Sequence, residues 1–173
     1  MVLRTVFGIL LISFIFTSCQ ISQEPKLYPF ESGDGYRGYM DAKGRIVIPA
    51  RFRDAFTEQL VVTKGFEGCL NIYTMDQFEK IATNLERLPS TKKDARQYVR
   101  LFISKAVECE IDSQNRINLP LNLMKEAGIE KRCVFIGAVD HIELWSLETW
   151  EAWYRQNSDN FAEVAESITD LLQ

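Results

Sequence analysis

Apolar and polar positions follow the same pattern twice along the chain. Residues 39–49 read YMDAKGRIVIP and residues 110–120 read EIDSQNRINLP, with Asp, Arg, Pro and the alternating apolar positions in register at an offset of 71. Residues 61–79 match residues 133–151 at an offset of 72, so a single inserted residue reconciles the two alignments. Repetition of this kind is typical of a duplicated supersecondary unit. The sequence therefore predicts two copies of a small, β-rich module.

Each copy predicts the same order of elements. Strands are expected at 36–40, 45–48, 60–63 and 69–73 of the first copy and at 133–136 and 142–145 of the second. Pro49 suits the first turn of a short helix, because its missing N–H would have no partner there. Thr74 with Gln77 forms a capping box, which predicts a helix that runs to about Leu88. In the second copy, Pro120 precedes the short helix, and the longer helix begins at Leu147.

Two apolar stripes predict further helices. Thr91 with Asp94 predicts a helix start after the break at Pro89. The stripe that follows has helical spacing and comprises Ala95, Tyr98, Val99, Phe102, Ile103 and Ala106. A second stripe near the C-terminus comprises Phe161, Val164, Ala165, Ile168, Leu171 and Leu172. This last stripe predicts a helix that packs on the core or contacts another subunit.

Neither copy is expected to fold alone. Each spans about 45 residues, and a unit of that size buries too little surface to be stable by itself. Two copies in one chain can supply each other's missing face. The duplication therefore predicts an intertwined, pseudo-symmetric unit rather than two independent domains.

The charges are distributed unevenly, although the net charge is only −4. Residues 139–173 carry eight carboxylates against the single cation Arg155, so the rest of the chain is net positive. The cations gather in two groups: Arg37, Lys43, Arg45, Arg51 and Arg53 in the first copy, and Arg87, Lys92, Lys93, Arg96, Arg100 and Lys105 between the copies. Such asymmetry can present a basic face to an anion, although a solvated surface is the alternative for either group.

The two repeated turns place charged residues at fixed positions. In the first turn, Asp41 can accept hydrogen bonds from turn amides and orient Arg45, and Gly44 permits a positive φ. Asn115 stands where the first turn has Gly44, and Asn tolerates the left-handed region, so the turn shape is expected to persist. Two interpretations of the Asp–Arg pairs are open. They lock the turns, or they present arginines to phosphates and guanine edges.

The composition argues against enzymes and metal sites. His141 is the only histidine, and Cys19, Cys69, Cys109 and Cys133 lie far apart, so no zinc-ligand spacing is present. Neither a nucleophile elbow nor a glycine-rich phosphate loop occurs. We therefore predict no catalytic activity, no cofactor and no small-molecule substrate. The tryptophans Trp145, Trp150 and Trp153 are expected to pack in the core rather than to form a ligand cage.

The N-terminus resembles a bacterial lipoprotein signal. Arg4 precedes an apolar run at residues 6–16, and Thr17, Ser18 and Cys19 follow. The run is too short for a comfortable transmembrane helix. The protein is either exported and lipidated at Cys19, or it carries an extension that does not direct export. A membrane partner is expected only in the first case.

The two turns and their spacing resemble the MraZ family of bacterial transcriptional regulators, which have two tandem SpoVT-AbrB modules. The resemblance covers about residues 30–155 and includes ARQYVRLFISKAVECEID before the second turn and ELWSLETWEAW after it. It implies an α+β, β-rich fold: a pseudo-dimeric, AbrB-like swapped-hairpin β-barrel with connecting and C-terminal helices. It also implies ring-shaped homo-oligomers that bind repeated double-stranded DNA sites upstream of the division and cell-wall gene cluster and usually repress it, in the cytoplasm and nucleoid. Gln114 departs from the pattern, because the second turn has no counterpart of Lys43.

These observations define a specific set of expectations. The segments are an extension at 1–34, module 1 at 35–82, linker helices at 83–105, module 2 at 106–149 and a helical tail at 150–173. The expected DNA contacts are Arg37, Lys43, Arg45, Arg51, Arg53 and Arg116. The expected turn-structuring residues are Asp41, Gly44, Asp112 and Asn115. The alternatives are an exported lipoprotein that uses the scaffold for another binding role, and an AbrB-type antitoxin.

Overall fold

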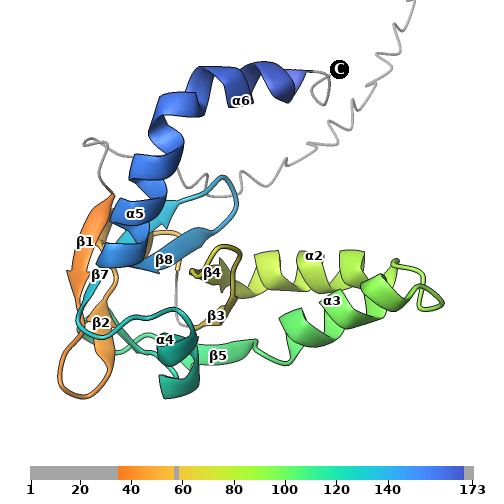
Figure 1. Cartoon of the computed structure of the whole chain (residues 1–173). Helices are drawn as coiled ribbons and strands as arrows, with labels where there is room; N and C mark the ends of the chain where they lie inside the picture. The colour runs from red at the N-terminus through yellow and green to blue at the C-terminus, as the bar shows by residue number, and fades with distance from the viewer. Residues whose placement is uncertain (1–34, 57–58, 170–173) are drawn as a thin grey trace, which may run out of the picture.

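The computed structural model describes residues 35–56 and 59–169 (Figure 1). Module 1 contains β1 (Tyr36–Tyr39), β2 (Arg45–Val47), α1 (Ala50–Arg53), β3 (Gln59–Lys64), β4 (Leu70–Thr74) and the start of α2 (Met75–Glu86). The helix α3 (Lys93–Ile103) follows. Module 2 contains β5 (Val107–Glu110), β6 (Arg116–Asn118), α4 (Leu121–Glu126), β7 (Arg132–Gly137), β8 (Ile142–Ser146) and the start of α5 (Leu147–Asn157). The chain continues through η1 (Ser158–Asn160) and α6 (Phe161–Ser167).

The two modules exchange their first strands. Six strands form one antiparallel sheet in the order β1-β7-β8-β4-β3-β5, and β2 pairs with β6 in a second, two-stranded sheet. The first strand of module 1, β1, therefore pairs with the hairpin of module 2, and β5 of module 2 pairs with the hairpin of module 1. This topology confirms the predicted swapped-hairpin α+β fold. It also explains why each module needs the other to complete its sheet.

The strand register reveals a pseudo-two-fold axis. Ile46 of β2 lies opposite Ile117 of β6, and these two residues are equivalent in the sequence repeat. Asn71 of β4 lies opposite Glu143 of β8, which is the second pair of equivalent residues. A residue can face its own equivalent across an antiparallel ladder only where a symmetry axis passes. The axis therefore runs through the β2–β6 pair and through the β4–β8 pair.

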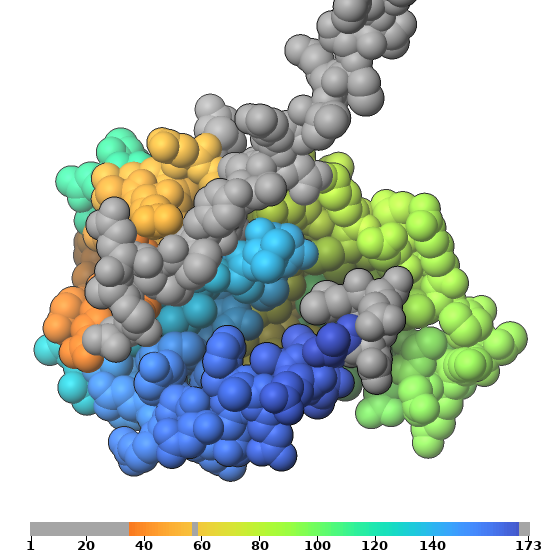
Figure 2. All heavy atoms as spheres, turned by 90° about the horizontal axis from the view of Figure 1, so that it is seen from above, coloured from red at the N-terminus to blue at the C-terminus, as the bar shows by residue number. Residues whose placement is uncertain are grey.

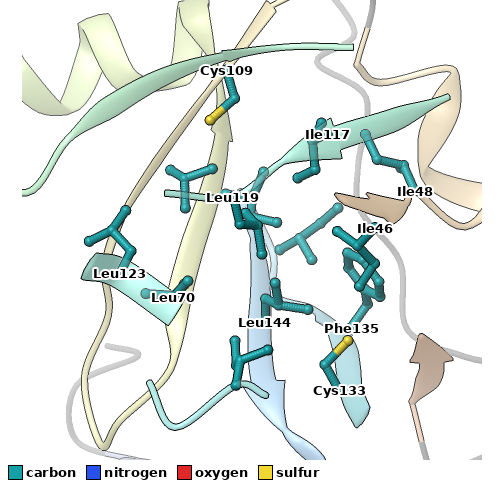
Figure 3. Close-up of a cluster of buried hydrophobic side chains, with 14 of the residues drawn as sticks. Ile46, Ile48, Leu70, Cys109, Ile117, Leu119, Leu123, Cys133, Phe135 and Leu144 are labelled. Carbon is teal, nitrogen blue, oxygen red and sulfur yellow. The ribbon is translucent and has the colours of Figure 1, made fainter. Parts of the chain in front are cut away.

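One hydrophobic core joins the modules. Ile46 and Ile117 are buried beside the axis, together with Phe135 and Leu144 from the hairpin of module 2 and Leu70 from that of module 1 (Figure 3). These side chains come from both copies and pack in one cluster. Apolar burial contributes roughly 1.5–3 kcal/mol for each such side chain. Neither module could keep this contribution after separation.

Equivalent hydrogen-bond networks occupy the two hairpins. In module 1, the Cys69 thiol donates to Asn71 Oδ1 at 3.4 Å, and Asn71 Nδ2 donates to the Tyr73 hydroxyl at 2.9 Å. In module 2, Trp145 Nε1 donates to Glu143 Oε2 at 2.9 Å, and His141 Nε2 lies 3.8 Å from Glu143 Oε1. The positions correspond one for one at the offset of 72. The same three positions are thus linked in both hairpins, through the amide of Asn71 in module 1 and through the carboxylate of Glu143 in module 2.

The helices between and after the modules differ partly from the expectations. The capping box of α2 is present, because Thr74 Oγ1 accepts from the Gln77 N–H and the Gln77 side chain accepts from the Thr74 N–H. The predicted start at Thr91 is wrong, since α3 begins at Lys93 and its N-cap makes no side-chain hydrogen bond. In α3 only Phe102 is fully buried, and α6 buries none of its residues. Helical periodicity therefore identified these helices, but parts of their apolar stripes stay exposed: Tyr98 and Ile103 on α3, and Phe161, Val164 and Ile168 near the C-terminus. Leu171 and Leu172 of the second stripe lie outside the described residues.

No helix within residues 35–56 and 59–169 has the length and apolar character needed to span a membrane. The signal-like apolar run and Cys19 lie outside the described residues. Export with lipidation at Cys19, and an extension that does not direct export, therefore both stay predictions.

Candidate nucleic-acid interface

The first repeated turn is organised around the carboxylate of Asp41. Asp41 Oδ1 accepts hydrogen bonds from the backbone N–H groups of Lys43 and Arg45 at 2.8 and 2.9 Å. Asp41 Oδ2 accepts from Arg45 Nε at 2.8 Å and lies 2.6 Å from Arg45 Nη2. A carboxylate that binds two amides and a guanidinium fixes both the backbone and the arginine side chain. The Arg45 fork therefore projects from the turn in one orientation.

The second turn repeats this arrangement. Asp112 Oδ1 accepts from the N–H groups of Gln114 and Arg116, both at 2.9 Å. Asp112 Oδ2 accepts from Arg116 Nε at 2.8 Å and lies 2.7 Å from Arg116 Nη2. Two independent stretches of sequence thus form the same four contacts. This repetition favours a common structural purpose for both turns.

The aspartates stay ionised far into the acid range. Hydrogen bonds from Arg45 lower the pKa of Asp41 to about 2, and hydrogen bonds from Arg116 lower the pKa of Asp112 to about 2. Both pairs are partly open to solvent, with side-chain exposures of 30% for Arg45 and 24% for Arg116. The contacts with aspartate use Nε and Nη2 of each arginine and do not use Nη1.

The backbone of both turns needs a residue with positive φ. Gly44 has φ +76° and Asn115 has φ +58°, so both residues occupy the left-handed region. Asn is the ordinary substitute for glycine in this conformation. The two turns therefore share a backbone shape although their central residues differ.

Direct hydrogen bonds join the two turns to each other. The Leu119 N–H donates to the Gly44 carbonyl at 3.0 Å, and the Ile48 N–H donates to the Asn115 carbonyl at 2.8 Å. With its amide nitrogen turned toward the first turn, the Asn118 side chain donates to the carbonyls of Lys43 and Gly44. The pairing of β2 with β6 thus makes the two turns one rigid surface. No local sequence pattern identifies Asn118, because its contact depends on this pairing.

A cleft of about 510 Å³ brings the two locked arginines together. Arg45, Asp112 and Arg116 line it, along with Glu108 and Glu110 of the edge strand β5. The three carboxylates of the lining outnumber its two arginines, so the cleft itself has no excess of positive charge. Cations around the turns must therefore supply any net attraction for a polyanion.

The other predicted contacts occupy several positions. Lys43 is exposed at the tip of the first turn, and Arg51 is exposed on α1. Arg53 is half-buried, and its Nε donates to the Ile48 carbonyl at 3.0 Å, so it also supports the backbone after β2. Arg37 on β1 lines a different cleft, beside α5. The structure therefore places Lys43, Arg45 and Arg116 on the joined turns and Arg37 away from the turn cleft.

The cysteines of the described residues are buried thiols. Burial raises the pKa of Cys69 and Cys133 to about 12 and that of Cys109 to about 11. A protonated thiol is neither a good nucleophile nor a good metal ligand. Within residues 35–56 and 59–169, no group of three or more His, Cys, Asp or Glu side chains is arranged to hold a metal ion.

A family model described as "MraZ protein, putative antitoxin-like" matches the chain twice, at residues 35–101 and 102–172. The chain belongs to the MraZ family. The Transcriptional regulator MraZ of Ligilactobacillus salivarius (strain UCC118) is 46% identical over 136 residues, which cover 79% of this chain and 95% of that protein. The Transcriptional regulator MraZ of Thermoanaerobacter sp. (strain X514) shows the same identity and coverage. The MraZ model leaves residues 1–34 unmatched, and each of its two matches contains one Asp–Arg turn.

Proposed function

We propose that this MraZ-family chain is a transcriptional regulator that binds double-stranded DNA through its joined turns. The relatives are named transcriptional regulators, which supports the class of function. The observation that carries the mode of action is the pair of aspartate-locked arginines on one hydrogen-bonded surface. The target follows from the family resemblance: repeated sites upstream of the division and cell-wall gene cluster, which a ring-shaped oligomer in the cytoplasm and nucleoid represses.

Fixed arginines suit contact with DNA for an entropic reason. An arginine that is free in solution loses rotamer freedom when it binds a phosphate or a guanine edge. Asp41 and Asp112 already hold Arg45 and Arg116, so less freedom is lost on binding. The Nη1 groups, which the aspartates do not use, are the donors that we expect to reach the DNA. Lys43 adds a mobile charge at the tip of the first turn.

A single chain offers few such contacts. Binding that depends on phosphate contacts alone has a dissociation constant of roughly 10⁻⁴–10⁻⁶ M at physiological salt. When several turn pairs are held in one assembly, each contact after the first becomes intramolecular and benefits from a high effective concentration. Self-association on repeated sites is therefore part of the proposed mechanism.

The duplication supplies a matched experiment. We expect Arg45→Ala and Arg116→Ala each to weaken binding to a duplex that contains the region upstream of the chain's own gene. We also expect a shallower slope of log affinity against log salt wherever the arginine contacts a phosphate. Fluorescence anisotropy over a salt series measures both quantities. Lys80→Ala is the control, because Lys80 is an exposed cation on α2, away from the turns.

Two further measurements complete the test. Urea denaturation of each variant separates lost binding from lost structure, because both arginines also stabilise their turns. Chromatin immunoprecipitation identifies the sites that the protein occupies in the cell. Unchanged affinity of both arginine variants would exclude the turns as the DNA contact, and absence of enrichment at the division and cell-wall cluster would exclude the proposed target.

The description of the matching family as antitoxin-like favours one second candidate, an antitoxin. An AbrB-type antitoxin binds DNA with the same type of module and also neutralises a toxin protein. Purification of the protein from its own cells would reveal a stoichiometric partner in that case. Intact-mass measurement of the same sample reports on residues 1–34 as well, because lipidation at Cys19 would favour the exported form.

A further inference from the structure

In module 1, the segment that leads into the exchanged strand β5 covers an aromatic cluster. The Phe102 ring, near the end of α3, lies 6.5 Å from the Tyr73 ring and 6.1 Å from the Phe78 ring, between centroids. The Thr63 hydroxyl donates to the Phe102 carbonyl at 2.9 Å, and Tyr73 and Phe102 are both buried. The chain that enters β5 from α3 thus shields aromatic side chains of the other module.

The equivalent cluster of module 2 opens onto a cleft of about 390 Å³. Trp145 and Trp150 stand where module 1 has Tyr73 and Phe78, and their rings lie 5.6 Å apart. Trp150 and Tyr154 line the cleft, and Tyr154 is 48% exposed. The helix α6 follows α5 but buries none of its own residues, so it does not shield this cluster as α3 shields that of module 1.

Two arginines flank the aromatic wall of this cleft. Arg37 comes from β1 and Arg155 from α5, and the lining residues carry these two cations against the carboxylate of Glu151. Neither arginine has an ion-pair partner within residues 35–56 and 59–169. In the view from above, β1 (orange) and α5 (blue) lie at the same end of the molecule (Figure 2). An aromatic wall with two unpaired guanidinium groups suits an occupant that is both aromatic and anionic.

The chain enters β1 pressed against module 2. Gly35 has φ +72°, and a Cβ on it would lie 2.4 Å from Val134 Cγ1 and 2.6 Å from Ile136 Cδ1. Only glycine fits such a close approach to β7. Val134 is the partner of Arg37 in the sheet, so the chain reaches β1 beside the cleft.

A segment of this chain stands where α3 stands in the repeat. At the offset of 71, which relates β5 to β1, residues 95–105 correspond to residues 24–34, which we call the entry segment. The entry segment lies outside the described residues, and the MraZ model leaves it unmatched. It carries two aromatic residues, Tyr28 and Phe30, and three carboxylates against one lysine. Cleavage before Cys19 would leave it attached, so both interpretations of the N-terminus retain it.

We propose that the entry segment covers the aromatic cluster of module 2 in its own chain, as α3 covers that of module 1. The rings of Tyr28 and Phe30 pack against Trp150 and Tyr154 and fill the cleft. This contact does not require a second α3, because the two prolines of the entry segment disfavour a helix. The cover would give the second module the shield that the first module already has.

Charge and chain length both favour this occupant. The carboxylates of Glu31 and Asp34 pair with the two arginines of the cleft, which lack partners otherwise. Phe30 precedes Tyr36 by six positions. Six extended residues span up to about 20 Å, so the Phe30 ring can reach along the cleft. An occupant supplied by the same chain also has a high effective concentration at the cleft.

Tryptophan emission reports on the cover directly, because the three tryptophans of the chain lie together in this cluster. Phe30→Ala in the full chain should shift the emission to longer wavelength and increase its quenching by acrylamide, because water reaches the cleft. Hydrogen exchange of the α5 amides should become about tenfold faster, since the burial of an aromatic ring is lost. Ser32→Ala is the control, because it changes the same segment without removing a ring or a charge. Unchanged emission and exchange for Phe30→Ala would overturn the inference.

A photoreactive side chain at position 30 tests the contact itself. With p-benzoylphenylalanine in place of Phe30, ultraviolet light should join the entry segment to α5, near Trp150 and Tyr154. Unlabelled chains refolded together with isotope-labelled chains show which copy is joined, because a link within one chain carries a single type of label. Links between differently labelled chains would assign the cleft to a second copy, and links that avoid α5 would exclude the cleft; either result overturns the inference. The same probe at Val139, which is 87% exposed and does not line the cleft, is the control.

Charge reversal tests the ion pairs. Glu31→Arg/Asp34→Arg should expose the tryptophans as Phe30→Ala does, because like charges then meet in the cleft. Adding Arg37→Glu/Arg155→Glu should restore the emission of the parent. Emission that ignores the first pair of changes, or that the second pair does not restore, would overturn the proposed pairing.

The inference does not depend on the proposed function, because the cleft beside α5 and the joined turns are separate surfaces. It gives Arg37, which lies away from the turn cleft, a partner in its own chain. Intact-mass measurement of the native protein supplies the last check. A native chain that begins after Phe30 would lack the occupant, and the inference would then be wrong.

Discussion

The two modules share a backbone and differ in the chemistry that it carries. In the hairpins, Cys69, Asn71 and Tyr73 form a network around a neutral amide at the positions where His141, Glu143 and Trp145 gather around a carboxylate. At the turns the similarity extends to the side chains, since Asp and Arg make the same four contacts in both copies. The turns thus keep their chemistry while the hairpins vary. This contrast is what we expect if the turns, rather than the hairpins, make the proposed contact with DNA.

The contrast extends to net charge. Module 1 has Lys43 on its turn and Arg51 and Arg53 on the following helix, where module 2 has Gln114, Asn122 and Met124. The joined surface is therefore more cationic on the side of module 1. An asymmetric surface of this kind can define a direction along a DNA site, which a symmetric pair of turns could not.

The largest effect is expected at the symmetry axis of the core. Ile46→Ala and Ile117→Ala each remove a buried side chain, and each should lower the free energy of unfolding by about 2–5 kcal/mol. Because the two residues face each other across the axis, their costs should be similar, and the double variant should cost less than the two together. Urea denaturation measures all three values. A large cost for only one of them would show that the modules do not share the core equally.

The next effect tests the equivalence of the turns. Gly44→Ala places a side chain at φ +76°, and this should cost about 1–2 kcal/mol of stability. Gly44→Asn reproduces the residue that the second turn already accepts, so it should cost clearly less. Asn115→Gly is the converse variant and should leave the stability nearly unchanged. Equal losses for Ala and Asn at position 44 would contradict a shared turn shape.

A smaller effect concerns the difference in charge between the turns. Lys43→Gln makes the first turn like the second, and it should reduce the salt slope of DNA binding by about 0.9 for each such turn on the DNA. Gln114→Lys makes the second turn like the first and should increase that slope by about the same amount. Anisotropy titrations over a salt series give both slopes. If Gln114→Lys changes nothing, the second turn does not face a phosphate.

The smallest effect is a pH dependence that only module 2 should show. Burial alone would lower the pKa of His141, but the nearby carboxylate of Glu143, the hydrogen bond with Asp140 and the charges of both residues raise it above its ordinary value. A raised folded-state pKa means that the stabilisation is complete below about pH 6.5 and is lost as the pH rises through the folded value. The nearby imidazole of His141 lowers the pKa of Glu143, so the stability that Glu143 contributes is lost as the pH falls through its folded-state pKa.

The measurement compares urea midpoints at about pH 5.5 and about pH 8.5, which lie on either side of the ordinary histidine value. The parent should be more stable at the lower pH, and His141→Gln should reduce the difference. Cys69, the equivalent residue in module 1, does not titrate in this range, because burial raises its pKa to about 12. A pH dependence that survives His141→Gln would assign it to other groups.

The sequence by itself determined the elements and the duplication. The Asp–Arg turns, the alternating strands and the Thr74–Gln77 capping box all act over a few residues, so their effects can be read from local spacing. The left-handed residue of each turn was predictable for the same reason, because only a few residue types accept a positive φ. The prediction of the swapped topology came from the family resemblance, because no local pattern encodes it.

Only the tertiary structure decided which side chains meet. Asn118 reaches the first turn because β2 pairs with β6, and Arg37 lies beside α5 because β1 pairs with β7. The stripe of α3 looked continuous in sequence, yet Phe102 is buried whereas Tyr98 and Ile103 of the same stripe stay exposed. Helical periodicity predicts that a helix has an apolar side, but it does not predict which residues cover that side. That depends on contacts between residues far apart in the chain, whose geometry exists only once both modules have exchanged their strands.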